Sequence, residues 1–229
     1  MISHREHPRK PRSPETSVCD DGEMNRTVSS RITAEVTETA DLVFSIAVAA
    51  SAPRTEESLA ITVNDTPIEI NEVSDAHGTR LHRVRAEPGQ LEVRYSATIE
   101  GTAREEIVDP VDLIRYLRPS RYCESDSLAP TAAAEFPDLD GAALLDAVSS
   151  WVGTRLAYVS GSSLPTDGAT RTLLARAGVC RDFAHLVVAL LRARNVPARL
   201  VSVYAPGLDP MDFHAVAEAY VEGAWHVVD

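Results

Sequence analysis

Short stretches of alternating apolar and polar residues dominate the first half of the chain. Residues 30–37 and 91–99 alternate in this way, and residues 42–48 and 59–63 form short apolar runs. Alternation places every second side chain on one face of a strand. Pro, Gly and Asn-Asp sequences, which form turns, separate the runs. The pattern predicts an N-terminal antiparallel β-rich domain, a sandwich or barrel, over residues 26–117.

The pattern changes towards helical spacing in the second half. Residues 109–137 show little periodicity, and the part at 116–123 is interpreted as a connection between domains. Asp140 is a suitable N-cap for a helix whose apolar residues recur every three or four positions, and Gly153 is expected to end it. Because further helices and then strands are predicted downstream, residues 118–229 form an α+β domain.

A second predicted helix begins near Cys180. Its apolar residues fall at spacings of three and four, as expected for a buried helical stripe: Phe183, Leu186, Val187, Leu190 and Leu191. Arg181, Asp182, His185 and Arg192 fall on the other side of the helical wheel. Cys180 therefore lies in the first turn, where free backbone N–H groups and the helix dipole stabilise a thiolate.

The last segment is predicted to be a β-hairpin. His214 begins an alternating strand, Glu222 and Gly223 are the two turn residues, and residues 225–229 form the partner strand. With this register Val216 lies opposite Asp229, so Asp229 is diagonal to His214 on the same face. A carboxylate reaches an imidazole from that position. The sequence therefore predicts a nucleophile, base and orienting acid in Cys180, His214 and Asp229.

These segments resemble the transglutaminase-like superfamily, in particular its bacterial members with an N-terminal β domain. The resemblance is carried by residues 177–185 around Cys180, residues 212–220 around His214 and residues 223–229. Residues 118–123 and 158–162 resemble upstream segments of the same group.

The resemblance implies a papain-like α+β core with Cys180, His214 and Asp229 as the catalytic triad. It also implies acyl transfer from an amide through a thioester, resolved by an amine or by water, and some members are inactive. Members usually continue with further strands after the residue that corresponds to Asp229, so we expect either that the sequence is a fragment or that its sheet is incomplete. Trp151 and Tyr158 are upstream candidates for an oxyanion donor, and spacing selects neither.

The net charge and the lengths of the apolar runs limit the classes of binding partner. The formal net charge of -12 argues against nucleic acid and anionic membranes, and no apolar run approaches the ~18 residues of a membrane helix. A protein, a peptide or a small amide is the expected substrate. Residues 1–25 are polar and Pro-rich, which predicts a disordered tail without a secretion signal and a cytoplasmic protein. Three cysteines, Cys19, Cys123 and Cys180, do not make a disulfide framework.

Two competing interpretations stay open. A metal site built from Cys180, His185, His214 and His226 lacks the short ligand pairs typical of zinc. No oxygen-rich calcium loop is present either, so no metal and no cofactor is predicted. The alternative is a catalytically silent interaction module on the same fold. Four further residues are assigned no catalytic part: Asp182, His185, Cys123 and His226.

Overall fold

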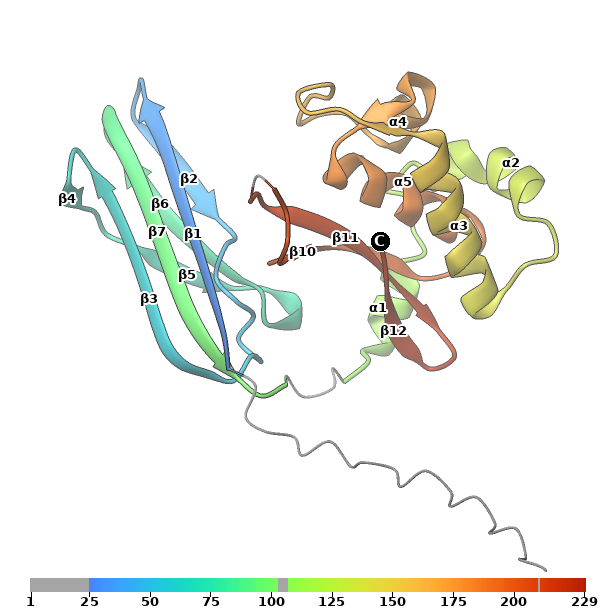
Figure 1. Ribbon diagram of the computed structural model, residues 1–229, viewed down its shortest axis with the longest axis horizontal. Helices are drawn as coiled ribbons and strands as arrows, with labels where there is room; N and C mark the ends of the chain where they lie inside the picture. The colour runs from blue at the N-terminus through green and yellow to red at the C-terminus, as the bar shows by residue number, and fades with distance from the viewer. Residues whose placement is uncertain (1–24, 103–106, 210) are drawn as a thin grey trace, which may run out of the picture. The chain divides into compact units, whose positions relative to one another are not determined.

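The computed structural model describes residues 25–102, 107–209 and 211–229, and the chain divides into two compact units between Glu105 and Glu106. The predicted tail lies almost wholly outside the described residues. Among the described residues no helix has both the length and the apolar character needed to cross a bilayer. The two units are described separately (Figure 1).

The N-terminal unit consists of two antiparallel sheets. The first has the order β1-β7-β3-β4, with β1 Asn25–Val36, β7 Gly89–Glu100, β3 Arg54–Val63 and β4 Thr66–Pro67. The second has the order β2-β6-β5, with β2 Ala40–Phe44, β6 Arg80–Ala86 and β5 Asn71–Ser74. A short 3-10 turn, Ala76–Gly78, joins β5 to β6.

Alternation along the central strand β7 explains how this unit buries its core. Every second residue is buried from Leu91 to Ile99, through Val93, Tyr95 and Ala97. Val84 and Ala86 of β6 are buried in the same way. The predicted antiparallel β-rich domain is confirmed, and the period of two that predicted it is the period of burial.

The C-terminal unit is an α+β domain, as predicted. Its helices are α1 Pro110–Arg115, α2 Ser125–Glu135, α3 Gly141–Arg155, α4 Ala169–Ala175 and α5 Cys180–Ala193. A small parallel pair joins β8 Ala157–Tyr158 to β9 Ala177–Gly178. An antiparallel sheet has the order β10-β11-β12, with β10 Ala198–Val203, β11 His214–Val221 and β12 Ala224–Val228.

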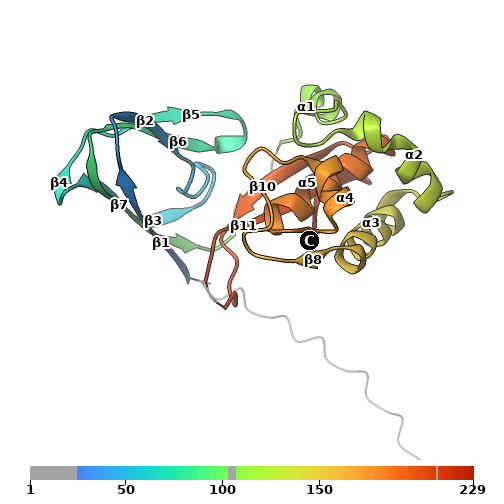
Figure 2. The ribbon, with the colours of Figure 1, turned by 90° about the horizontal axis from the view of Figure 1, so that it is seen from above.

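Helix α5 is the centre of the C-terminal unit. Its residues from Leu186 to Leu191 are almost entirely buried, and it packs on β10 and β11 on one side and on α2, α3 and α4 on the others. Figure 2 shows α5 lying along β10 and β11. The small residues Ala217 and Ala219 of β11 belong to this core, which lets the helix approach the sheet closely.

The segment expected to connect the domains belongs to the C-terminal unit. Residues 116–123 form no helix or strand, but α1 and α2 flank them. Tyr116 at the end of α1 accepts a hydrogen bond from the N–H of Ala198 and packs edge-on against Trp225. These contacts attach α1 to the sheet, so the observed division falls earlier than residue 117.

Helix α3 also differs from its expected end. It continues through Gly153 to Arg155, because the N–H of Leu156 still donates to the carbonyl of Val152 and Thr154 bonds back to Ser150. A glycine inside a helix is tolerated at a cost of about 1 kcal/mol relative to alanine. The prediction that Gly153 ends the helix was wrong.

Candidate active site

Cys180 occupies the first position of α5. The N–H groups of Asp182 and Phe183 both donate to the carbonyl of Val179, which is the N-cap. The N–H of Cys180 lies where the helix itself offers no acceptor. The predicted placement of this thiol in the first helical turn is confirmed.

The sulfur of Cys180 lies beside the strand that carries His214. Its Sγ is 3.8 Å from the carbonyl oxygen of Phe213, the residue that immediately precedes His214. His214 is the first residue of β11. Residues separated by more than thirty positions in sequence are thus brought together at the start of one helix and the start of one strand.

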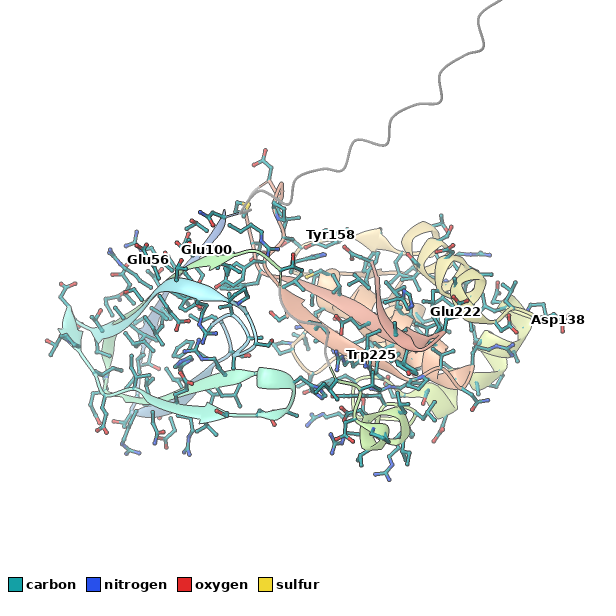
Figure 3. All side chains as sticks on the ribbon, turned by 90° about the horizontal axis from the view of Figure 1, so that it is seen from below. Glu56, Glu100, Asp138, Tyr158, Glu222 and Trp225 are labelled. Atoms are coloured by element: carbon teal, nitrogen blue, oxygen red, sulfur yellow. The ribbon has the colours of Figure 1, made fainter. Side chains whose placement is uncertain are left out.

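The hairpin β11–β12 has the predicted register. Tyr220 pairs with Trp225, and the turn residues Glu222 and Gly223 both have positive φ, of 52° and 89°. Two positive φ values in a two-residue loop are those of a type I′ turn. The hairpin carries the labels Glu222 and Trp225 in Figure 3.

The register places Asp229 against His214. The Nε2 atom of His214 is 3.0 Å from Oδ2 of Asp229, which is a hydrogen-bonding distance. The ring therefore uses Nε2 towards the carboxylate and has Nδ1 left for another partner. Ser149 on α3 donates its hydroxyl to the backbone oxygen of Asp229 at 2.8 Å and helps to hold that residue.

Asp182 fixes the backbone around the start of α5. Its carboxylate is fully buried and accepts hydrogen bonds from the N–H of Val179, the hydroxyl of Ser163 and the guanidinium of Arg181. Burial by itself would raise the pKa of Asp182, but these three donors outweigh it, and the pKa lies below its ordinary value. The carboxylate stays charged and ties the loop after β8 to the helix.

Gly178 makes room for that carboxylate. A Cβ atom at this position would lie 2.7 Å from Cβ of Asp182, closer than real side-chain contacts. The glycine just before Cys180 is therefore required by packing and not by a positive φ. Asp182 has the structural role that was predicted for it, but the spacing of residues in the sequence does not reveal its partner Ser163.

His185 is buried and not on a solvated helix face. It is 8% exposed, stacks on Tyr122 with ring centroids 5.3 Å apart, and its Nδ1 has no hydrogen-bond partner among the described residues. Burial lowers the pKa of His185. A structural role stands, and the contact that supports it among the described residues is the stacking on Tyr122.

The remaining candidates do not converge on the thiol. Cys123 is buried in the core, and this burial raises the pKa of its thiol. His226 on β12 pairs with Ala219 of β11, and its side chain is exposed. In the part of the chain that is described, no three His, Cys, Asp or Glu side chains come together as a metal site.

The structure distinguishes between Trp151 and Tyr158, the two side chains considered as donors to an oxyanion. The indole N–H of Trp151 donates to Glu135 at 2.8 Å, so it is already engaged. Tyr158 is exposed on β8, which pairs directly with Gly178. Of the two, Tyr158 therefore remains, because its backbone lies beside the segment that leads into Cys180.

Comparison with known proteins identifies the family and the fold. Residues 130–229 match the model of the transglutaminase-like superfamily. The crystal structure of a protein from Cytophaga hutchinsonii, described as a "putative cysteine protease", is 37% identical with a TM-score of 0.81. The match covers 91% of this chain and 76% of that one.

Curated relatives share a shorter segment. An uncharacterised protein of Mycobacterium tuberculosis is 39% identical over 93 residues, which is 38% of this chain and 30% of that protein. One from Mycobacterium leprae is 32% identical over 88 residues, which is 35% of this chain and 32% of that protein. The chain thus matches about a third of the length of these relatives. The family match and the similarity to the Cytophaga protein over most of both chains show that this protein belongs to the transglutaminase-like superfamily.

Proposed function

We propose that this protein transfers an acyl group from an amide of a peptide or protein through a thioester on Cys180. The observation that carries the proposal is one connected arrangement. The thiol at the start of α5 lies beside the backbone that leads into His214, and His214 bonds Asp229 at 3.0 Å. A nucleophile, a base and a group that orients the base are the minimum set for nucleophilic catalysis.

In the acylation step the imidazole of His214 accepts the thiol proton, and the thiolate attacks the amide carbonyl. Asp229 at Nε2 leaves Nδ1 as the nitrogen that takes this proton, and its charge stabilises the imidazolium. The N–H of Cys180 and the positive end of the α5 dipole stabilise the tetrahedral oxyanion. The C–N bond then breaks, and the amine leaves with the proton from His214.

In the deacylation step His214 removes a proton from the acceptor, which attacks the thioester and releases the thiolate. A primary amine gives a new amide and water gives an acid. Acceptance of water alone would make the protein a cysteine peptidase or amidase, and the description of the Cytophaga protein supports that second candidate. Both candidates use the same acylation step.

The test is intact-mass spectrometry of the full chain with glutamine peptides and other amide donors, with and without an added primary amine. We expect an acyl adduct on the wild type and none on Cys180→Ala. His214→Ala should slow adduct formation by about a hundredfold or more, as for loss of a general base. Release by the amine identifies a transglutaminase, and release by water alone a hydrolase.

The matched control is Cys123→Ala, which removes a thiol of the same unit that is buried in the core. This variant should form the adduct at the wild-type rate. Iodoacetamide should alkylate Cys180 much faster than Cys123, and peptide mapping separates both from Cys19. No adduct together with equally slow alkylation of Cys180 and Cys123 would leave a silent interaction module.

A further inference from the structure

Five large apolar side chains are exposed on β8, on the loop that follows it and on the loop before β11. We name them the apolar rim, and its members are Tyr158, Val159, Leu164, Met211 and Phe213. Their exposed fractions run from 45% to 70%. Exposed apolar side chains that gather at one place mark binding surfaces, whereas single ones need no explanation.

Both parts of the apolar rim are connected directly to Cys180. Tyr158 pairs with Gly178, two residues before Cys180, and the N–H of Val159 donates to the carbonyl of Gly178 at 3.0 Å. Phe213 offers its own carbonyl to the sulfur at 3.8 Å. The backbone segments that carry these side chains therefore adjoin Cys180 or the residues just before it.

The loop after β8 is held in place while its apolar side chains face solvent. The N–H of Leu164 is bound by Asp167 at 2.9 Å, and its carbonyl is bound by Arg181 at 3.0 Å. Ser163 of the same loop is tied to Asp182. The backbone is thus fixed by polar contacts, and Leu164 is still 64% exposed. A surface held in this way is preformed for a ligand.

Strand β8 also presents a free edge. The N–H groups of Ala157 and Val159 both point to β9, where they bond the carbonyls of Arg176 and Gly178. Successive residues of a strand turn their polar groups to opposite edges, so the N–H and carbonyl of Tyr158 face away from β9. Among the described strands, β8 pairs with β9 alone. An extended peptide can add to such an edge.

The charges on these loops are of one sign. Residues 159–168 contain one charged residue, Asp167, and residues 204–213 contain two, Asp209 and Asp212. The nearby cation Arg181 is engaged with Asp182, Ser163 and the carbonyl of Leu164. An acidic side chain on the substrate would therefore meet carboxylates on these two loops and, at Arg181, a cation that is already paired.

We infer that the acyl donor is an extended peptide with an apolar side chain next to the reacting carbonyl, and that acidic side chains are excluded there. This inference rests on the proposed function and names its substrate class. The apolar rim buries the side chain beside the reacting carbonyl, and the edge of β8 aligns the peptide backbone. Binding of the donor's apolar side chain to the apolar rim therefore raises the rate at which Cys180 is acylated.

The test uses nitrophenyl esters of N-acetylated dipeptides that differ in one residue, leucine or aspartate, at the acyl position. The thiolate attacks the ester carbonyl, the C–S bond forms, the C–O bond breaks, and nitrophenolate leaves. Activated esters acylate a reactive thiol even where the amide is a poor substrate. We expect the leucine ester to acylate Cys180 at least about tenfold faster than the aspartate ester.

Leu164→Ser and Met211→Ser should each reduce this leucine-to-aspartate ratio about threefold. Alkylation by iodoacetamide, which is too small to need the apolar rim, should be unchanged in both. The matched control is Ile114→Ser on α1, because Ile114 is 61% exposed and its helix contacts Trp225, at the hairpin end of the sheet. This variant should keep the wild-type ratio.

The outcomes separate the two claims. Acylation of Cys180 with equal rates for the leucine and aspartate esters overturns the inference and leaves the proposed function standing. A ratio that Ile114→Ser lowers as much as Leu164→Ser also overturns the assignment to the apolar rim. No acylation by either ester, with slow alkylation of Cys180, rejects the proposed function and the inference with it.

Discussion

Each unit of this protein contains a network of charged side chains, and the two networks differ in burial: Asp182 is fully buried, whereas Glu57 and Glu72 are exposed and only Arg80 is partly buried. In the N-terminal unit Arg80 of β6 bonds Glu57 of β3 at 2.6 Å and Glu72 of β5 at 2.8 Å. In the C-terminal unit Asp182 bonds Arg181 and Ser163, all within twenty positions of sequence. The first network joins strands of both sheets, and the second joins one loop to one helix.

The two networks contain similar ion pairs, but they lie at different distances in sequence from Cys180, and their effects on the protein should differ for that reason. Removing the network at Asp182 leaves buried polar groups without partners, which costs stability, whereas water can solvate the carboxylates of the Arg80 network. Only the network at Asp182 also holds the loop of the apolar rim and the backbone before Cys180. We therefore expect the Arg80 network to affect stability alone, and the Asp182 network to affect stability and thiol reactivity together.

The largest effect is expected from Asp182→Ala. The change leaves Arg181, Ser163 and the N–H of Val179 without their common partner, and the C-terminal unit should lose about 3 kcal/mol of unfolding free energy. Both tryptophans, Trp151 and Trp225, lie in this unit, so tryptophan fluorescence during urea unfolding reports on it alone. Alkylation of Cys180 should slow in the folded variant.

The matched control for this change is Asp126→Ala. Asp126 also lies in the first turn of a helix, α2, but it is exposed. Its removal should cost less than about 1 kcal/mol, the usual contribution of an exposed acid at a helix start. Equal losses in the two variants would show that the buried contacts of Asp182 contribute nothing beyond the helix dipole.

A smaller loss, of about 1.5 kcal/mol, is expected from Arg80→Met in the N-terminal unit, because solvent around Glu57 and Glu72 weakens their bonds to the partly buried arginine. Arg80 lowers the pKa values of both Glu57 and Glu72, although partial burial opposes this at Glu57, so the variant leaves two carboxylates without their shared cation. Far-UV circular dichroism should show the loss, while the tryptophan transition and the alkylation rate of Cys180 stay at wild-type values. A changed alkylation rate would contradict the separation of the two networks.

Arg85→Met is the control for that variant. Arg85 is largely exposed and reaches Asp41 at 3.4 Å. An exposed ion pair contributes between about 0 and 1 kcal/mol. The two arginines lie on the same strand, so the difference between the variants isolates burial.

The sequence predicted the hairpin and the site better than it predicted the packing around them. The register of β11 and β12 follows from two turn residues and a period of two, which are local properties of residues 214–229. Once that register is known, the contact between His214 and Asp229 can be predicted without any knowledge of the rest of the fold. The position of Cys180 follows in the same way from the start of one helical stripe.

The polar side of α5 was not predictable, because its cover comes from distant segments. Asp182 and His185 look solvated on a helical wheel, but Ser163 and Tyr122 lie over them. Helix α2 was also missed, since Pro130 lies inside it and little of its sequence is periodic. Such features depend on tertiary contacts, which local patterns do not contain.

The two units should lose unfolding free energy over different ranges of acidic pH, and the loss in the C-terminal unit should be moderate. Burial lowers the pKa of His185, so the unfolded chain binds a proton that the folded unit does not. This contribution is fully present above the unfolded pKa of about 6.5 and is lost as pH falls below it, by up to about 1.4 kcal/mol per pH unit.

The measurement is the urea midpoint of the tryptophan transition between pH 7.5 and pH 5. We expect the wild-type midpoint to fall over this range and the slope to flatten in His185→Gln. Glu57 and Glu72, whose pKa values are lowered, contribute stability that is lost only as pH falls below about 4.5. Circular dichroism of the N-terminal unit should therefore change little above pH 5. An unchanged slope in the variant would show that His185 accepts a proton without unfolding.

The smallest effect is expected from Tyr95→Phe, which trims the Arg80 network without removing its cation. The hydroxyl of Tyr95 donates to Glu57 at 2.7 Å and accepts the N–H of Val48 at 3.0 Å, so its loss should cost about 1 kcal/mol. Burial first, and then the bond to Glu57, raise the pKa of Tyr95 to about 12. The folded unit thus keeps a proton that the unfolded chain loses above pH 10, and wild-type stability should fall between pH 10 and pH 12. Tyr95→Phe should lack this fall in circular dichroism, and a fall of equal size would assign it to another group.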